Sequence, residues 1–159
     1  MGSNDSNNQG IAPRMLQALF GFIEDSDEHM EFAVKTAYLE IYLEKIRDLL
    51  NPKKKNLKIR EDKMNGVYID EITEEYVSEY SEVVAMMKAG NRNRETSATL
   101  MNEDSSRSHS IFMITLSQTN LRDYSSKTGK LCLVDLAGSE KVSKSGAAGL
   151  RLDEAKNIN

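Results

Sequence analysis

The stretch Leu131-Cys132-Leu133-Val134-Asp135-Leu136-Ala137-Gly138 decides the fold class, because an apolar run ends in an acid and a glycine follows three residues later. The run from Lys130 to Leu136 predicts a strand of a covered sheet, with Cys132 buried in it. An acid at the carboxyl end of such a strand lies at the crevice where α/β sheets bind their ligands. Its carboxylate can hold Mg²⁺ directly or through water, and the glycine lets a backbone N–H approach a phosphate. Taken alone, the Asp-x-x-Gly pattern also arises at unrelated strand ends.

A second polar stretch, Asn102 to His109, leads directly into an apolar run that begins at Ile111. It carries three serines, an asparagine and an arginine. Serine hydroxyls can complete the octahedral shell of Mg²⁺, and an arginine can pair bidentately with a carboxylate. By itself the stretch could also be a serine-rich capping turn. The polar segment from Thr119 to Gly129 is the right length for a long hairpin, which would bring both stretches to the same end of the sheet.

Strands and helices alternate along the rest of the chain without a break in composition, which predicts one α/β layer structure. The expected elements are a loop at 1–10, a helix from Ile11 with Pro13 in its first turn, a strand from Phe32 to Tyr42, a helical face of Ile46, Leu49 and Leu50, short strands at 57–60 and 67–69, a helix capped by Ser81 and ending near Gly90, strands at 111–116 and 130–136, and a helix that begins at 152–159.

Composition narrows the class of protein further. The 159 residues are enough for one domain with its own core, and the net charge of -4 argues against nucleic-acid binding. The densest basic run, Lys53-Lys54-Lys55, lies beside Asn51-Pro52 and is interpreted as a solvated turn. No apolar run approaches the roughly 18 residues that a membrane span needs, so we expect no membrane insertion. A single cysteine without metal-ligand spacing is typical of a reducing compartment, which indicates the cytoplasm.

The two polar stretches together resemble switch I and switch II of the kinesins. Asn102-x-x-Ser105-Ser106-Arg107-Ser108-His109 corresponds to the first and Asp135-Leu136-Ala137-Gly138-Ser139-Glu140 to the second. Three further segments resemble kinesin segments in the right order, and they are Tyr38 to Tyr42, Ile46 to Leu50 and Leu152 to Asn159. The run from Lys141 to Gly146 is most similar to the conventional heavy-chain branch.

The resemblance covers the whole chain and implies the three-layer kinesin-motor fold of the P-loop NTPases, with a mixed central sheet flanked by helices, here as an incomplete fragment. It assigns 1–10 to a loop, 99–109 to switch I, 135–150 to switch II with its following loop, and 151–159 to the start of a tubulin-facing helix.

The resemblance also implies ATP and Mg²⁺ as cofactors. Asn102 and Ser105 would place the attacking water and the γ-phosphate. Ser106 would bind Mg²⁺ and Asp135 would hold it through its water shell, and both are candidate metal ligands. The N–H of Gly138 would contact the γ-phosphate.

Other implied roles concern closure of the site and polymer contact. Arg107 and Glu140 would form a salt bridge that joins the two switches for hydrolysis. His109 would order the start of its strand rather than move protons. Lys141 and Lys144 would face the acidic surface of tubulin, although without the resemblance they read as solvated lysines.

No G-x-x-x-x-G-K-[ST] phosphate-binding loop occurs in the sequence, so we expect the P-loop upstream of Met1 and this fragment alone to be inactive. The resemblance implies a microtubule-stimulated ATPase of the cytoplasm and cytoskeleton, dimerised through a coiled-coil stalk. Two other functions compete with this one. A non-catalytic microtubule- or partner-binding fragment stays open, whereas a small GTPase fits only the Asp-x-x-Gly pattern, because the guanine-reading N-K-x-D motif is missing.

Overall fold

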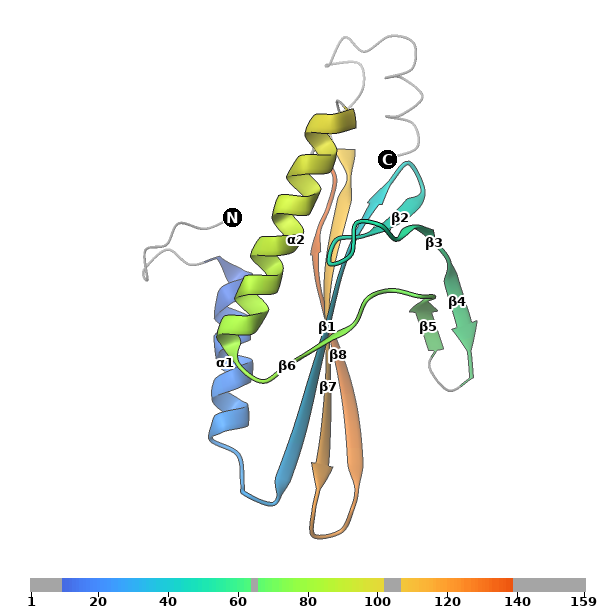
Figure 1. The fold of residues 1–159 in the computed structure, drawn as a ribbon. Helices are drawn as coiled ribbons and strands as arrows, with labels where there is room; N and C mark the ends of the chain where they lie inside the picture. The colour runs from blue at the N-terminus through green and yellow to red at the C-terminus, as the bar shows by residue number, and fades with distance from the viewer. Residues whose placement is uncertain (1–9, 64–65, 102–106, 139–159) are drawn as a thin grey trace.

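The computed structural model describes residues 10–63, 66–101 and 107–138 (Figure 1). Its two helices are α1 (Ile11–Glu24) and α2 (Tyr80–Met101). Its strands are β1 (Met30–Tyr42), β2 (Lys45–Asp48), β3 (Lys55–Leu57), β4 (Ile59–Asp62), β5 (Gly66–Ile69), β6 (Glu75–Val77), β7 (His109–Asn120) and β8 (Ser126–Asp135).

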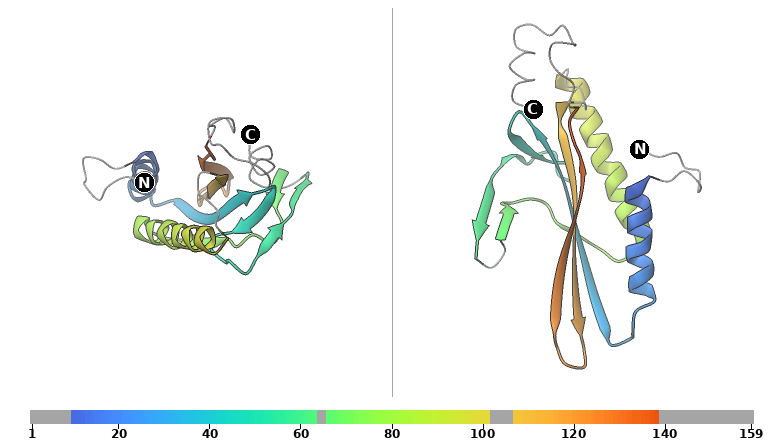
Figure 2. Two further views of the ribbon diagram at one scale, coloured as in Figure 1. Left: turned by 90° about the horizontal axis from the view of Figure 1, so that it is seen from above. Right: turned by 180° about the vertical axis from the view of Figure 1, so that it is seen from behind.

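The main sheet has six strands, in the order β3-β2-β1-β7-β8, and β6 pairs with β1 off this path. Every pairing between the described strands is antiparallel. The long strands β1, β7 and β8 lie side by side and twist about one another, and β4 and β5 make a separate small hairpin (Figures 1 and 2). The expected strands at 32–42, 111–116, 130–136 and 67–69 are confirmed, and the expected long hairpin is the β7–β8 pair.

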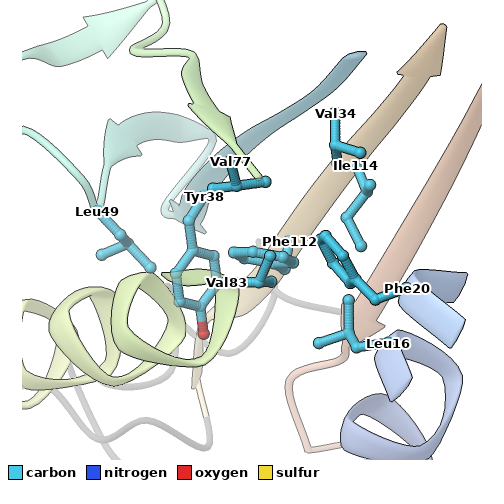
Figure 3. Close-up of a cluster of buried hydrophobic side chains, with 9 residues drawn as sticks. All are labelled: Leu16, Phe20, Val34, Tyr38, Leu49, Val77, Val83, Phe112 and Ile114. Carbon is cyan, nitrogen blue, oxygen red and sulfur yellow. The ribbon is translucent and has the colours of Figure 1, made fainter. Parts of the chain in front are cut away.

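Both described helices cover the same face of this sheet, as the view from above shows (Figure 2). Alternate residues of a strand point to the same side, so positions 34, 36, 38 and 40 of β1 all face the helices. The buried apolar cluster between these layers consists of Leu16, Phe20, Val34, Tyr38, Leu49, Val77, Val83, Phe112 and Ile114 (Figure 3). The described residues therefore supply two layers, and the helix expected at 151–159 lies outside them.

The helical face expected at Ile46, Leu49 and Leu50 is wrong, because the chain turns back on itself after β1. Leu43 and Glu44 have φ angles of 47° and 60°, and this two-residue turn pairs β2 with β1. The Asp48 carboxylate then accepts the backbone N–H groups of Leu50 and Asn51 at 2.8 and 2.9 Å. These bonds stabilise an irregular turn where a helix would have continued.

The helix expected from Ser81 to Gly90 has a different start and a different end. Ser81 lies inside the first turn of α2, while Ser78 precedes the helix and donates its backbone N–H to the Glu82 carboxylate at 2.7 Å. Gly90 does not end the helix. It is buried in the middle of α2, where an added Cβ would lie 2.2 Å from Cδ1 of Tyr38.

The expectation of a buried thiol at Cys132 is also wrong for the described residues. Cys132 is exposed, and Val134 and Leu136 are 52% and 70% exposed. Both described helices pack on the other face of the sheet, so nothing described covers the face to which Cys132 and Val134 point.

Candidate functional site

The β7–β8 hairpin brings the two polar stretches to one end of the sheet. Ser110 near the start of β7 pairs directly with Asp135 at the end of β8. The Nδ1 atom of His109 accepts the backbone N–H of Ala137 at 3.1 Å, which ties the first turn after β8 to the first residue of β7. The expected adjacency of the two strands is confirmed, so the segments that leave them at this end start side by side.

Four polar residues lie opposite one another across four neighbouring strands at this end. Arg47 of β2 pairs with Glu40 of β1, Glu40 with Ser110 of β7, and Ser110 with Asp135 of β8. Residues directly opposite in antiparallel strands project to the same face, and here that face carries α2. We call Arg47, Glu40, Ser110 and Asp135 the polar row.

Arg94 of α2 lies over the polar row and joins its members. Its Nη1 donates to Ser110 Oγ at 3.2 Å and to Asp135 Oδ2 at 2.9 Å. Its Nη2 donates to the backbone oxygen of Ser108 at 3.0 Å, and its Nε lies 3.5 Å from Glu40 Oε1. The guanidinium thereby connects α2 and β1 with the start of β7, where the first polar stretch ends, and with the end of β8, where the second begins.

Burial makes this arrangement costly to disturb. The side chains of Arg94 and Glu40 are only 9% and 4% exposed, whereas that of Asp135 is 73% exposed. A buried charge has to be paired, and removing one partner of a buried pair costs about 3–5 kcal/mol. Arg94 was missed from the sequence, because an arginine in a polar helix is ordinarily solvated. A possible signal is its spacing from Val83, Met87 and Gly90, which places it on the inward stripe of α2.

Tyr38 lies between the polar row and the buried apolar cluster. The Tyr38 hydroxyl donates to Asn91 Oδ1 at 2.7 Å, and its ring packs edge-on to Phe112 at 5.3 Å. Burial raises the pKa of the Tyr38 phenol above its ordinary value, which keeps the group neutral beside the charged row.

The structure places some of the sequence-derived site residues and leaves others outside the described residues. Asp135 and Gly138 lie at the end of β8 and just beyond it, and Arg107 is half-buried ahead of β7. The expected residues that lie outside are Asn102, Ser105, Ser106, Glu140, Lys141 and Lys144. Their roles stay predictions, as does the Arg107–Glu140 pair.

The described residues contain no group of three or more His, Cys, Asp or Glu side chains gathered as a closed protein cage would need. Neither helix is long and apolar enough to cross a membrane.

The whole chain, residues 1–159, matches the family model of the kinesin motor domain, so the chain belongs to that family. Among curated proteins it is 52% identical to Kinesin-related protein 3 of Dictyostelium discoideum, with 99% of the chain and 14% of that protein covered. It is 51% identical to the human Kinesin-1 heavy chain, with 98% of the chain and 16% of that protein covered.

Solved structures give the same fold. The structure of a fast kinesin superposes with a TM-score of 0.92 at 48% identity, over 99% of this chain and 45% of that one. The motor and motor homology domain of Kar3Vik1 gives a TM-score of 0.81 at 37% identity, over 94% of this chain and 39% of that one. The expected kinesin fold is confirmed, and the chain spans less than a fifth of the curated relatives and less than half of the solved chains.

Proposed function

We propose that this chain is the switch-bearing part of a microtubule motor that couples ATP hydrolysis to microtubule binding and movement. One observation carries the proposal. In a chain that matches the kinesin motor domain from end to end, the β7–β8 hairpin brings the end of the Asn102–His109 stretch and the start of the Asp-x-x-Gly stretch to the same sheet end. Two loops that leave one site together can report on the same ligand and move together.

The residues at this sheet end fit Mg²⁺ and a nucleotide phosphate. Asp135 ends its strand with an exposed carboxylate, and only its Oδ2 is engaged by Arg94 in the bond described above. A carboxylate has about four acceptor positions, so Asp135 keeps capacity for a hard cation or its water. Mg²⁺ is commonly held by one or two carboxylates together with substrate phosphates, which needs no protein cage. When bound, it would neutralise charge on the phosphates.

The remaining roles follow the resemblance. Ser106 and Asp135 would hold Mg²⁺, Asn102 and Ser105 would orient the attacking water, and the Gly138 N–H would contact the γ-phosphate. In this proposal residues 99–109 and 135–150 are the two switches, and 151–159 begin the helix that faces tubulin.

Partner and location follow from the same proposal. Lys141 and Lys144 would contact the microtubule, which sets the protein in the cytoplasm on the cytoskeleton. The intact protein would act as a homodimer through a coiled-coil stalk. The rival, a binding module without hydrolysis, lacks a specific observation in its favour, whereas heavy-chain relatives at about half identity support the motor.

The experiment separates hydrolysis from polymer binding in a complete motor domain that contains these residues. Glu140→Ala removes the proposed partner of Arg107, so it should lower microtubule-stimulated kcat by about 100-fold or more while ATP binding stays largely intact. The double variant Lys141→Ala/Lys144→Ala should do the opposite. It should raise the microtubule concentration for half-maximal rate and flatten its salt dependence, because surface attraction is screened over about 10 Å at 0.1 M salt.

Normal stimulated turnover in Glu140→Ala would refute the switch assignment. An unchanged half-maximal microtubule concentration in the double lysine variant would leave Lys141 and Lys144 as solvated loop residues. A complete domain that binds microtubules but never hydrolyses ATP would favour the binding module.

A further inference from the structure

His109 contacts the Asp-x-x-Gly stretch in a way that the proposed function does not use. It is the first residue of β7, where the Asn102–His109 stretch ends, and its side chain is half-buried. Its Nδ1 atom accepts the backbone N–H of Ala137 at 3.1 Å. A ring nitrogen that accepts a hydrogen bond carries no proton, so this contact uses the neutral imidazole with its proton on Nε2.

The contact begins where the pairing of β7 with β8 ends. Ser110 and Asp135 are the last residues that lie opposite one another in this ladder, and β8 ends at Asp135. Backbone N–H groups beyond a ladder need other partners, because an unpaired donor is costly away from water. The side chain of His109 supplies that partner for Ala137, and so extends the connection between the two strands beyond the end of β8.

His109 acts on the opposite face of the sheet from Arg94. Ser110 and Asp135 project towards α2, and successive residues of a strand point to opposite faces, so His109 points away from α2. The carboxylate of Asp135 is thus held from one face by Arg94, while the backbone that follows it is held from the other face by His109. Replacement of His109 therefore leaves the bond between Arg94 and Asp135 in place.

The bond to Ala137 restricts the direction of the next N–H group, which is that of Gly138. A peptide unit is planar, so holding the Ala137 N–H fixes the plane of the Leu136–Ala137 peptide. Only the φ and ψ angles of Ala137 separate this plane from the peptide that carries the Gly138 N–H. A donor that is oriented before the ligand arrives stabilises charge better than one that has to be ordered on binding.

We propose that His109 is a positioning residue for Gly138: its bond to Ala137 directs the Gly138 N–H towards the γ-phosphate, and so lets the site distinguish ATP from ADP. ADP has no γ-phosphate and gains nothing from this N–H. The inference rests on the proposed function, in which the Gly138 N–H contacts the γ-phosphate. It gives the end of the first polar stretch a direct effect on the second, through a neutral hydrogen bond.

The test compares two nucleotides in a complete motor domain that contains these residues. The affinities for fluorescent ADP and for a fluorescent, non-hydrolysable ATP analogue are measured without microtubules, and their ratio is the readout. His109→Leu removes the acceptor, so the analogue should bind about three- to tenfold more weakly relative to ADP, as expected for loss of one neutral hydrogen bond. A purely structural role would weaken the binding of both nucleotides together and lower the melting temperature, with the ratio unchanged.

Two amide variants test the position of the acceptor. The side-chain oxygen of asparagine can take the place of Nδ1, whereas that of glutamine lies one bond further from the backbone. His109→Asn should therefore keep the parental ratio, and His109→Gln should behave as His109→Leu does. This pair decides the matter even if His109→Leu fails to fold. Equal ratios for His109→Asn and His109→Gln would overturn the inference, as would a parental ratio in His109→Leu.

His29→Leu is the matched control, because His29 is the other histidine of the chain and binds the N–H of Leu121 through its backbone oxygen. It should leave the ratio unchanged. Gly138→Ala hinders close approach to the γ-phosphate, so it should lower the ratio by itself, and His109→Leu should then have no further effect. A further loss in that background would overturn the inference. An unchanged ratio in Gly138→Ala, or a parent domain that binds neither nucleotide, would instead count against the proposed function.

Discussion

At the scale of single residues, the turn between β1 and β2 has a conformation that its residue types do not predict. Leu43 and Glu44 both have positive φ angles, 47° and 60°. A two-residue hairpin turn with both angles positive favours Asn-Gly or similar pairs, because larger side chains clash in this region. Leu-Glu gives no such signal, so the apolar spacing of Ile46, Leu49 and Leu50 that follows wrongly predicts a helix.

This turn leads to a stability prediction at Glu44. Glu44 is exposed, so its replacement removes no packing and mainly relieves the left-handed conformation. Glu44→Gly should therefore raise the free energy of unfolding of a complete motor domain by about 0.5–1 kcal/mol. The measurement is urea denaturation followed by circular dichroism.

Glu31→Gly is the matched control, because Glu31 is also exposed but lies in regular strand β1, opposite Thr119. There glycine should lower stability by roughly 0.5–1 kcal/mol. Equal losses in both variants would mean that the Leu43-Glu44 turn stores no strain.

At the scale of elements, the packing of α2 on the sheet decides both the core and the site. Gly90 and Arg94 are four residues apart and share one face of the helix. Tyr38 and Glu40 are two residues apart and share one face of β1. The glycine lies against the Tyr38 ring, and one turn later the arginine reaches Glu40. Close approach at Gly90 thus sets Arg94 on the polar row.

Replacement of Gly90 tests this packing. Alanine is favoured over glycine inside a helix by about 1 kcal/mol, yet its Cβ would lie 2.2 Å from Tyr38 Cδ1. The Tyr38 ring is held by its bond to Asn91 and by Phe112, so it cannot simply swing away. Gly90→Ala should therefore lower the free energy of unfolding by about 1–3 kcal/mol despite the gain in propensity.

Gly21→Ala in α1 provides the comparison, because nothing lies within 4 Å of an added Cβ there. It should stabilise the protein by up to about 1 kcal/mol, so the two Gly→Ala changes should have opposite signs in the same thermal or urea melt. A stabilising Gly90→Ala would show that α2 lies further from β1 than described.

The sequence predicts those elements in which the spacing of apolar residues agrees with the positions that the structure buries, such as α1, β1 and the β7–β8 hairpin. It also located Asp135 at a strand end, because the acid directly follows an apolar run. Arg94 could not be found in this way. Its partners lie 14 to 54 residues away along the chain, from Ser108 to Glu40, and only the crossing of α2 over the sheet brings them together.

At the scale of the whole molecule, the described sheet ends at β8. Ser126 to Lys130 are exposed, and the apolar Val134 and Leu136 are 52% and 70% exposed. No described strand pairs with the outer edge of β8. An unpaired edge with apolar neighbours is a template for pairing with another chain.

Residues 1–159 on their own should therefore self-associate and fail as a nucleotide site. A P-loop supplies the backbone amides and lysine that hold the β- and γ-phosphates, and this sequence contains no such motif. In the proposed function Ser106, Asp135 and Gly138 only complete a phosphate site, so they should not form one alone. We expect no Mg·ATP binding at micromolar concentrations by calorimetric titration, no phosphate release, and concentration-dependent association in sedimentation velocity.

A single charged substitution on β8 tests whether pairing at the edge of this strand, rather than exposed apolar surface in general, drives the association. Val134→Lys places a lysine on the last described strand, where charge blocks edge-to-edge pairing, and it should restore a smaller sedimenting species. Tyr124→Lys removes an apolar side chain that is 80% exposed, but at the tip of the β7–β8 hairpin, and it should leave association unchanged. If both variants dissolve the aggregates equally, exposed apolar surface rather than the β8 edge drives association. Micromolar Mg·ATP binding with turnover by these residues alone would show that they form a nucleotide site without a P-loop.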